Sequence, residues 1–205
     1  MVPQLTLPAV EKPSRIAVFA SGSGSNAERL IEHFTRSTAG DVVLIVYNRK
    51  HAGVVERADR LEIERHYEPK GGYDGEDFLH MLERKGIDLI VLAGFLLKVP
   101  EALIRAFPDR IINIHPALLP DYGGKGMYGM NVHEAVVAAG ERKSGITIHL
   151  VNERYDEGRI LSQFSCKLEP SDKAEDVQRK VQVLEHEHFG PVVEEYILNH
   201  VHRSV

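Results

Sequence analysis

The sequence feature that most constrains the fold is a repeated alternation of short apolar runs with amphipathic stretches. Residues 26–34 and 77–84 carry apolar side chains at helical spacing, and Gly86 follows the second stretch as a stop signal. Four runs are short and apolar enough to be buried strands, namely residues 15–20, 42–48, 88–94 and 111–114. Repetition of strand, helix and strand predicts a parallel, doubly wound sheet.

The second half of the chain follows a different pattern. A glycine-rich loop at 122–129 precedes a predicted helix near 131–139, and two alternating runs at 145–151 and 159–168 predict adjacent strands with a short connection that allows an antiparallel arrangement. A long helix should then begin near Ser171 or Asp172 and be interrupted or restarted at Pro191. We therefore expect an α/β fold: a Rossmann-like, doubly wound, mostly parallel sheet flanked by helices, with a C-terminal antiparallel strand and a long helix.

Length and composition set further bounds. The 205 residues are enough for one well-buried core, so we expect a single domain over residues 1–205, with residues 1–13 as a flexible tail. The formal net charge of −5 gives no basic field for nucleic acid or an anionic membrane, which favours small-molecule partners and a monomer or homodimer. One cysteine, Cys166, excludes an internal disulfide and suits a reducing compartment, and no apolar run approaches the ~20 residues of a membrane span. The cytoplasm is the expected location.

The segment IINIHPALLP, residues 111–120, carries the first candidate chemistry. Asn113 and His115 stand two apart at the end of an apolar run, and in a strand such residues point to the same face. A carboxamide and an imidazole on one face can together donate hydrogen bonds to an oxyanion formed at a carbonyl carbon. The alternative is that both side chains only cap a turn before Pro116.

A second candidate is the segment SGSGSN, residues 21–26, between the first strand and the first helix. Its glycines allow tight backbone curvature, and free N–H groups at a helix start can bind phosphate oxygens. A phosphate monoester, a dinucleotide and a purely structural turn are all compatible with this loop. NAD is disfavoured because residues 47–50, YNRK, lack the acidic residue for its ribose, whereas NADP stays open through Arg49 or Lys50.

Asp156 follows the predicted strand 145–151, where a strand's carboxyl end would put its carboxylate on the functional edge of the sheet. Pairing with His115 would favour the imidazolium and raise the His115 pKa. The alternative is an ordinary acidic turn. No metal site is expected, because the pairs His186/His188 and His200/His202 would diverge on a helix.

These segments together carry a resemblance to the phosphoribosylglycinamide formyltransferases, enzymes of purine biosynthesis. It extends over roughly residues 14–198 and rests on five motifs in the same order: SGSGSN (21–26), LAGF (92–95), NIHPALLP (113–120), YDEG (155–158) and QVLEHE (182–187). The resemblance implies formyl transfer from 10-formyltetrahydrofolate to the amine of glycinamide ribonucleotide. It also implies that no cofactor is tightly bound, the folate being a co-substrate.

The same resemblance implies roles for particular residues. Asn113 and protonated His115 would stabilise the oxyanion, and Asp156 would orient His115. The ribonucleotide would be bound by Gly24, Ser25, Asn26, Gln182 and Glu185, and the folate by Leu92, Leu97, Val99, Leu103, Ile104, Asn152 and Asp156. Without the resemblance, Gln182 and Glu185 would be a solvated helix face and the apolar residues would be core.

Three departures and two rivals complete the expectations. Arg159 stands where a proline often follows the acidic turn, and one rival is a metal-binding or purely interacting protein, prompted by the eleven histidines. Leu97 and Lys98 stand where some relatives have arginine followed by an apolar residue, and residues 121–131 form a longer, glycine-rich loop that predicts a mobile lid. The closest rival is a formyltetrahydrofolate hydrolase, which would use the same triad with water as acceptor. Such hydrolases resemble this chain with an extra N-terminal domain, for which residues 1–14 are too short.

Overall fold

The computed structural model describes residues 12–201, so that only the last two residues of the predicted tail 1–13 fall within it. Its elements follow in the order β1 (Ser14–Ala20), α1 (Ser25–Phe34), β2 (Gly40–Tyr47), α2 (Val54–Arg60), β3 (Arg65–Tyr67), α3 (Glu76–Arg84), β4 (Leu89–Leu92), α4 (Glu101–Ala106), β5 (Ile111–His115), α5 (Met130–Ala138), β6 (Lys143–Leu150), β7 (Ile160–Lys167), α6 (Ala174–Tyr196) and a terminal π-helix, η1 (Ile197–Val201).

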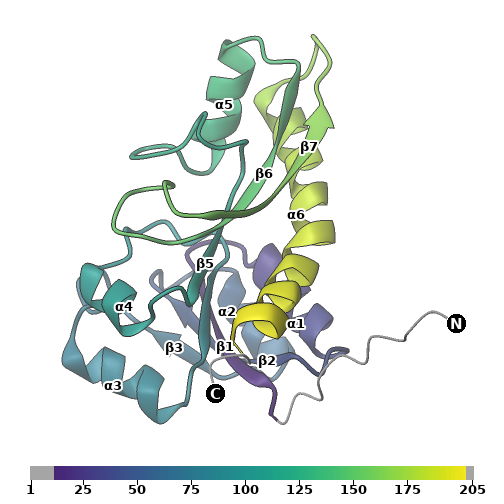
Figure 1. Cartoon of the computed structure of the whole chain (residues 1–205). Helices are drawn as coiled ribbons and strands as arrows, with labels where there is room; N and C mark the ends of the chain where they lie inside the picture. The colour runs from purple at the N-terminus through teal and green to yellow at the C-terminus, as the bar shows by residue number, and fades with distance from the viewer. Residues whose placement is uncertain (1–11, 202–205) are drawn as a thin grey trace, which may run out of the picture.

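Within residues 12–201, seven strands form one sheet in the order β3-β2-β1-β4-β5-β6-β7 (Figure 1). The strands from β3 to β5 are mutually parallel, β6 runs antiparallel to β5, and β7 runs antiparallel to β6. The predicted mostly parallel α/β sheet with an antiparallel C-terminal part and a long helix is therefore confirmed.

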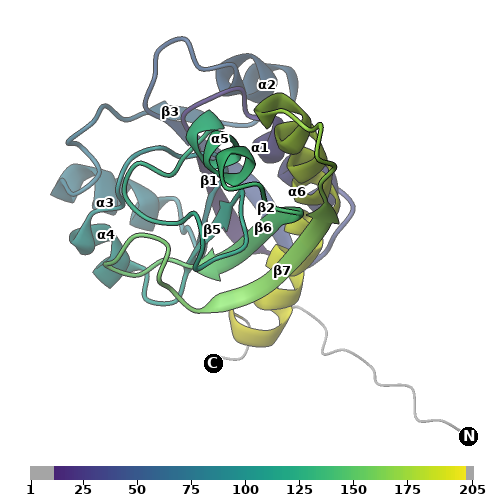
Figure 2. The ribbon, with the colours of Figure 1, turned by 90° about the horizontal axis from the view of Figure 1, so that it is seen from above.

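Both faces of the sheet are covered, as the near-continuous apolar character of β1 requires. Along β1, Ile16 and Val18 join a core cluster with α1 and α6, whereas Ala17 and Phe19 join a second cluster with α3 and α4. The view from above shows α3 and α4 on the opposite side of the molecule from α6 (Figure 2). Side-chain alternation along one strand thus positions helices on both faces.

At the carboxyl end of the parallel strands, fewer strands remain paired with each step along the sheet. Leu92, the last residue of β4, pairs with Asn113, but His115 pairs only with Thr147 of β6. Beyond that point β6 pairs only with β7, and the two strands rise beside α5 and α6 (Figure 1). The parallel part and this antiparallel extension meet at the end of β5, which is where Asn113 and His115 lie.

Three short elements were not predicted: α2, β3 and α4. They have seven, three and six residues respectively, too few to show a clear apolar period. Val54 and Ala58 of α2 are buried in the core cluster that includes α1. Leu103 of α4 is fully buried in the cluster on the other face of the sheet. Tertiary packing therefore stabilises α2 and α4, and pairing with β2 holds β3.

The long helix was predicted with two errors. It begins at Ala174 rather than Ser171 or Asp172, because the Asp172 carboxylate accepts the Glu169 N–H (2.8 Å) and closes the preceding turn. It also continues through Pro191 without interruption. Gly190 lies directly against the His33 ring, and Val192 and Val193 are buried, so packing against α1 holds the helix together across the proline.

Within residues 12–201, no helix combines the length and apolar character that crossing a membrane requires.

Candidate active site

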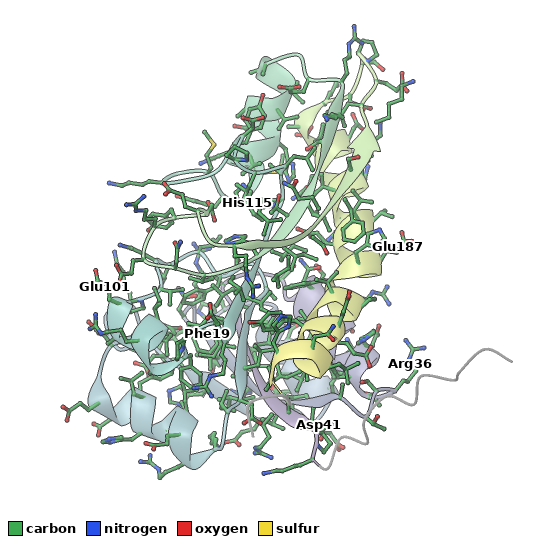
Figure 3. All side chains as sticks on the ribbon, in the orientation of Figure 1. Phe19, Arg36, Asp41, Glu101, His115 and Glu187 are labelled. Atoms are coloured by element: carbon green, nitrogen blue, oxygen red, sulfur yellow. The ribbon has the colours of Figure 1, made fainter. Side chains whose placement is uncertain are left out.

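A pocket of about 660 Å³ opens where the parallel sheet and the antiparallel extension meet. Its volume lies within the range of small-molecule sites. His115 marks its position near the middle of the molecule (Figure 3). The walls are the segment 22–26, the ends of β4 and β5, the glycine-rich residues 124–129, the turn 151–156 and one side of α6. All three candidate motifs therefore face the same cavity.

The anion-binding loop, residues 21–26, is held by rigid backbone contacts. Gly24 has a φ of 79°, and a Cβ there would lie 2.6 Å from Cβ of Val54, so only glycine fits. The Val54 N–H donates to the Gly22 carbonyl (3.2 Å), and the Ser21 N–H donates to the Gly94 carbonyl (3.0 Å). The start of α2 and the turn after β4 thus fix the loop from two sides.

The long helix α6 reaches this loop through two side chains. Asn26 Nδ2 donates to Glu185 Oε2 (2.9 Å), and Gln182 Nε2 donates to Ser25 Oγ (3.3 Å). Burial raises the pKa of Glu185, against the opposing effect of the Asn26 hydrogen bond. The structure therefore brings together the five residues predicted for the ribonucleotide: Gly24, Ser25, Asn26, Gln182 and Glu185.

Asn113 and His115 both line the pocket, as their spacing in a strand predicts. His115 is buried, with 3% of its surface exposed. Its Nδ1 lies 3.7 Å from Oδ2 of Asp156, and its Nε2 lies 2.8 Å from the Tyr122 carbonyl oxygen. Because a carbonyl only accepts, Nε2 carries the proton in the neutral ring, and Nδ1 faces the carboxylate.

The expected rise in the His115 pKa is wrong. Burial lowers the pKa of His115 below its ordinary 6.5 and outweighs the opposing effects of the Asp156 charge and the Tyr122 carbonyl. The nearby His149 lowers it further. His115 is therefore neutral at neutral pH, able to accept a proton at Nδ1.

Asp156 lines the pocket, but not because it follows the carboxyl end of a parallel strand, as the sequence analysis assumed. Because β6 is antiparallel, its end at Leu150 lies beside Ile112, and it is the following turn that carries Asp156 to the site. Burial raises the pKa of Asp156, but the neighbouring His149 and His115 rings and the hydrogen bond from the Gly124 N–H outweigh it and lower the pKa overall. The carboxylate stays ionised.

The sequence analysis did not single out two histidines of the site. His149 Nδ1 donates to the Leu150 carbonyl (2.8 Å), which leaves Nε2 to accept from Asn113 Nδ2 at 3.1 Å, with Oδ1 of Asp156 3.6 Å away. His133 on α5 also lines the pocket, and burial, with a smaller effect from the neighbouring His115, lowers its pKa to about 4. Period-two spacing in β6 could have flagged His149, which pairs with Asn113.

Two backbone groups of the glycine-rich loop contact the candidate catalytic side chains. The Tyr122 carbonyl accepts from His115 Nε2, and the Gly124 N–H donates to Asp156 Oδ2, each at 2.8 Å. Residues 124–129 of the same loop form one wall of the pocket. Its predicted mobility as a lid stays a prediction.

The residues predicted for the folate divide into two groups. Leu92, Leu97, Val99, Asn152 and Asp156 line the pocket. Leu103 and Ile104 do not line the pocket. Both lie on α4 and pack into the core cluster that α4 shares with α3, so for these two residues the alternative of core packing holds. The departure at Lys98 faces the pocket, with Nζ 5.9 Å from the ring centre of Tyr155.

Among residues 12–201, no three histidine, cysteine, aspartate or glutamate side chains come together as metal ligands would. His188 instead stacks on Phe164, with ring centres 3.7 Å apart. His202 lies outside the described residues.

The pocket therefore joins two kinds of chemistry. At one end, free backbone N–H groups and polar side chains can hold an anion. At the other, an amide donor, a neutral imidazole and a carboxylate surround a common space, as addition to a carbonyl carbon requires.

Comparison with known proteins agrees with this arrangement. Residues 14–193 match the family described as formyl transferase. The chain is 43% identical over 186 residues to an Arabidopsis thaliana protein named chloroplastic phosphoribosylglycinamide formyltransferase, covering 87% of this chain. It is 30% identical to the Bacillus subtilis phosphoribosylglycinamide formyltransferase, covering 89% of this chain and 94% of that protein.

A crystal structure of phosphoribosylglycinamide formyltransferase from Anaplasma phagocytophilum superposes with a TM-score of 0.84 at 29% identity, covering 92% of this chain and 88% of that one. The chain spans 64% of the length of the Arabidopsis protein and 60% of that of a similarly named protein from Vigna unguiculata.

Proposed function

The chain belongs to the formyl transferase family, and we propose that it transfers the formyl group of 10-formyltetrahydrofolate to the amine of glycinamide ribonucleotide, N1-(5-phospho-D-ribosyl)glycinamide. The products are formylglycinamide ribonucleotide and tetrahydrofolate. The observation that carries the proposal is one pocket shared by an anion-binding loop and by Asn113, His115 and Asp156. The names of the relatives supply the acceptor and the transferred formyl group, and the resemblance of the sequence motifs implies the folate donor.

The ribonucleotide enters with its phosphate on the loop around Gly24 and Ser25. N–H groups at the start of α1 favour a negative charge there. Glu185 and Gln182 face the same space from α6 and bind the ribose or glycyl part. This placement directs the amine toward the end of β5.

The folate occupies the remaining wall. Leu92, Leu97 and Val99 provide an apolar edge, and the turn at Asn152 and Asp156 provides polar groups for the pterin. Asn152 is fixed in that turn, because its Nδ2 donates to the Glu157 carbonyl and its Oδ1 accepts the Arg154 N–H. The glycine-rich loop closes over both substrates as a lid.

Proton movement follows from the neutral state of His115. The amine attacks the formyl carbon and forms a C–N bond, and its excess proton moves to Nδ1 of His115. The resulting imidazolium lies between the Asp156 carboxylate and the Tyr122 carbonyl, which both favour it. The second N–H of Asn113 Nδ2 and the imidazolium stabilise the oxyanion. The proton then passes to the folate nitrogen as its bond to the formyl carbon breaks.

We further propose that both substrates are bound transiently, with no tightly bound cofactor, and that the protein acts as a monomer or homodimer in the cytoplasm. A single cysteine suits a reducing compartment. Plant relatives named chloroplastic make the location a point to test directly.

Release of tetrahydrofolate, followed spectroscopically with and without the ribonucleotide, tests the proposal. Release should require the ribonucleotide and fall by about two to four decades in His115→Ala, the usual contribution of a general acid–base group. Release without ribonucleotide would identify a hydrolase instead. Absence of release from the wild-type protein under both conditions would refute formyl transfer.

A further inference from the structure

Three consecutive residues of the glycine-rich loop, Tyr122 to Gly124, form backbone hydrogen bonds to both members of the candidate catalytic pair, His115 and Asp156. The Tyr122 carbonyl accepts from His115 Nε2, and the Gly124 N–H donates to Asp156 Oδ2. We call this segment the backbone clasp. No side chain of the clasp takes part in either contact, so its backbone conformation alone sets the position of these two groups.

That backbone conformation is costly for Tyr122 but not for Gly124. Tyr122 has a φ of 56° and Gly124 a φ of 93°, both in the left-handed region, which a tyrosine rarely adopts. A Cβ on Gly123 would lie 2.5 Å from Leu119 Cδ2 and 3.3 Å from Asp156 Cβ. The clasp therefore needs an additional contact to hold Tyr122 in this conformation.

The Tyr122 side chain provides that contact. Its hydroxyl donates to Oε1 of Glu141 at 2.8 Å, and its ring packs against the main core cluster. Glu141 lies just after α5, where its N–H donates to the Val136 carbonyl (3.3 Å). The hydroxyl and the carboxylate thus connect the clasp to the end of a helix outside the pocket.

The consequence for His115 is a fixed tautomer and orientation. With Nε2–H donated to the clasp, Nδ1 is the nitrogen that faces Asp156 and the pocket. The titratable groups around the ring are Asp156, His149 and His133, none of which bonds Nε2. If the Tyr122 carbonyl moved away, the Asp156 carboxylate, which only accepts, would favour a proton on Nδ1 instead, and the two tautomers would compete.

We propose that Tyr122 and Glu141 are positioning residues, which hold the backbone clasp so that His115 presents Nδ1 to the reacting amine. This inference deepens the proposed formyl transfer and rests on it for its kinetic readout. Neither side chain touches the substrates; both act through the clasp backbone.

Tyr122→Phe and Glu141→Met test the proposal, because the first removes the donor of the anchoring hydrogen bond and the second its acceptor, each with little change in volume. Each should lower kcat roughly three- to tenfold, as expected for one lost hydrogen bond, and change either KM by less than about twofold. The double variant should be no worse than the more affected single one. Tyr67→Phe and Glu134→Met, on β3 and on the exposed side of α5, are matched controls and should behave as wild type.

The second readout is independent of activity. In ¹⁵N-histidine-labelled protein, His115, assigned with His115→Ala, should be a single Nε2-protonated tautomer in the wild type and a mixture in both variants. Wild-type kcat with a single tautomer in the variants would overturn the proposal. So would a fall in kcat and Tm with the tautomer unchanged, which would indicate a structural role only. If the wild type proved inactive, the proposed function would fail, and the tautomer comparison would still decide the clasp.

Discussion

The two ends of the pocket are built in different ways. At the ribonucleotide end, one continuous segment, residues 21–26, provides the anion-binding loop, and backbone contacts to Val54 and Gly94 hold it. At the catalytic end, Asn113, His149 and Asp156 come from β5, β6 and the turn after β6. The anion-binding loop is thus local in the sequence, whereas the catalytic group is assembled from separate segments only once the chain has folded.

The two ends of the pocket also depend on different physical interactions. The anion-binding loop depends on steric fit, since its close approach to α2 leaves no room for a side chain at Gly24. The catalytic end depends on a balance between burial and charge, which lowers the pKa of both His115 and Asp156. Variants at the two ends should therefore fail in different measurements.

The largest effect should come from Asp156→Asn, which removes the charge beside His115. We expect kcat to fall by about 10² or more, as for other disrupted acid–base pairs. The Asp156 charge raises the His115 pKa, so its removal should lower that pKa further and move the acid limb of the pH profile to lower pH.

The exposed neighbour Glu157 offers a matched control. Glu157→Gln should leave both kcat and the acid limb unchanged, because Glu157 pairs with Arg154 outside the catalytic group. An acid limb that moves to higher pH in Asp156→Asn would contradict the assigned sign.

A smaller effect is expected from Gly24→Ala at the ribonucleotide end. The left-handed φ and the Val54 contact should destabilise the fold by about 2 to 3 kcal/mol, measured by urea unfolding. The ribonucleotide KM should rise, with kcat less affected. Gly22→Ala is the control, because a Cβ there meets no atom within 4 Å; equal destabilisation of both variants would disprove the steric account.

The smallest effect concerns Arg57, whose Nε donates to the Ser23 carbonyl (2.8 Å). Arg57→Ala should raise the ribonucleotide KM roughly two- to fivefold without changing kcat, since one exposed hydrogen bond to the loop is lost. Arg60→Ala is the control that distinguishes loss of this hydrogen bond from loss of a positive charge. Arg60 also pairs with Glu28, but Arg57 is the one that donates to the loop. Equal effects of the two substitutions would make the cause electrostatic.

The sequence analysis succeeded where the signal is periodic or local. Apolar runs predicted four strands of the parallel sheet, and the spacing of Asn113 and His115 placed both in one pocket. Elements such as α2 and α4 were missed because they are too short for a period and depend on burial against distant segments.

The electrostatics of the site could not be read from the sequence. The direction of the His115 pKa was predicted from a single neighbour, whereas the folded chain adds burial, His149 and the Tyr122 carbonyl. The contacts of Tyr122 with His115 and Glu141 depend on a left-handed backbone conformation, which a sequence pattern does not predict at a tyrosine.

The most direct measurement of the central claim is calorimetric binding of glycinamide ribonucleotide to the wild type, Asn113→Ala and Gly24→Ala, alongside formyl transfer by each. Asn113→Ala should bind the ribonucleotide with wild-type Kd and lose about 10² to 10³ in kcat, as for a removed oxyanion donor. Gly24→Ala should lose affinity by about tenfold or more and retain most of kcat at saturation. Weakened ribonucleotide binding in Asn113→Ala, or unchanged binding in Gly24→Ala, would contradict the division of the pocket into a binding end and a catalytic end.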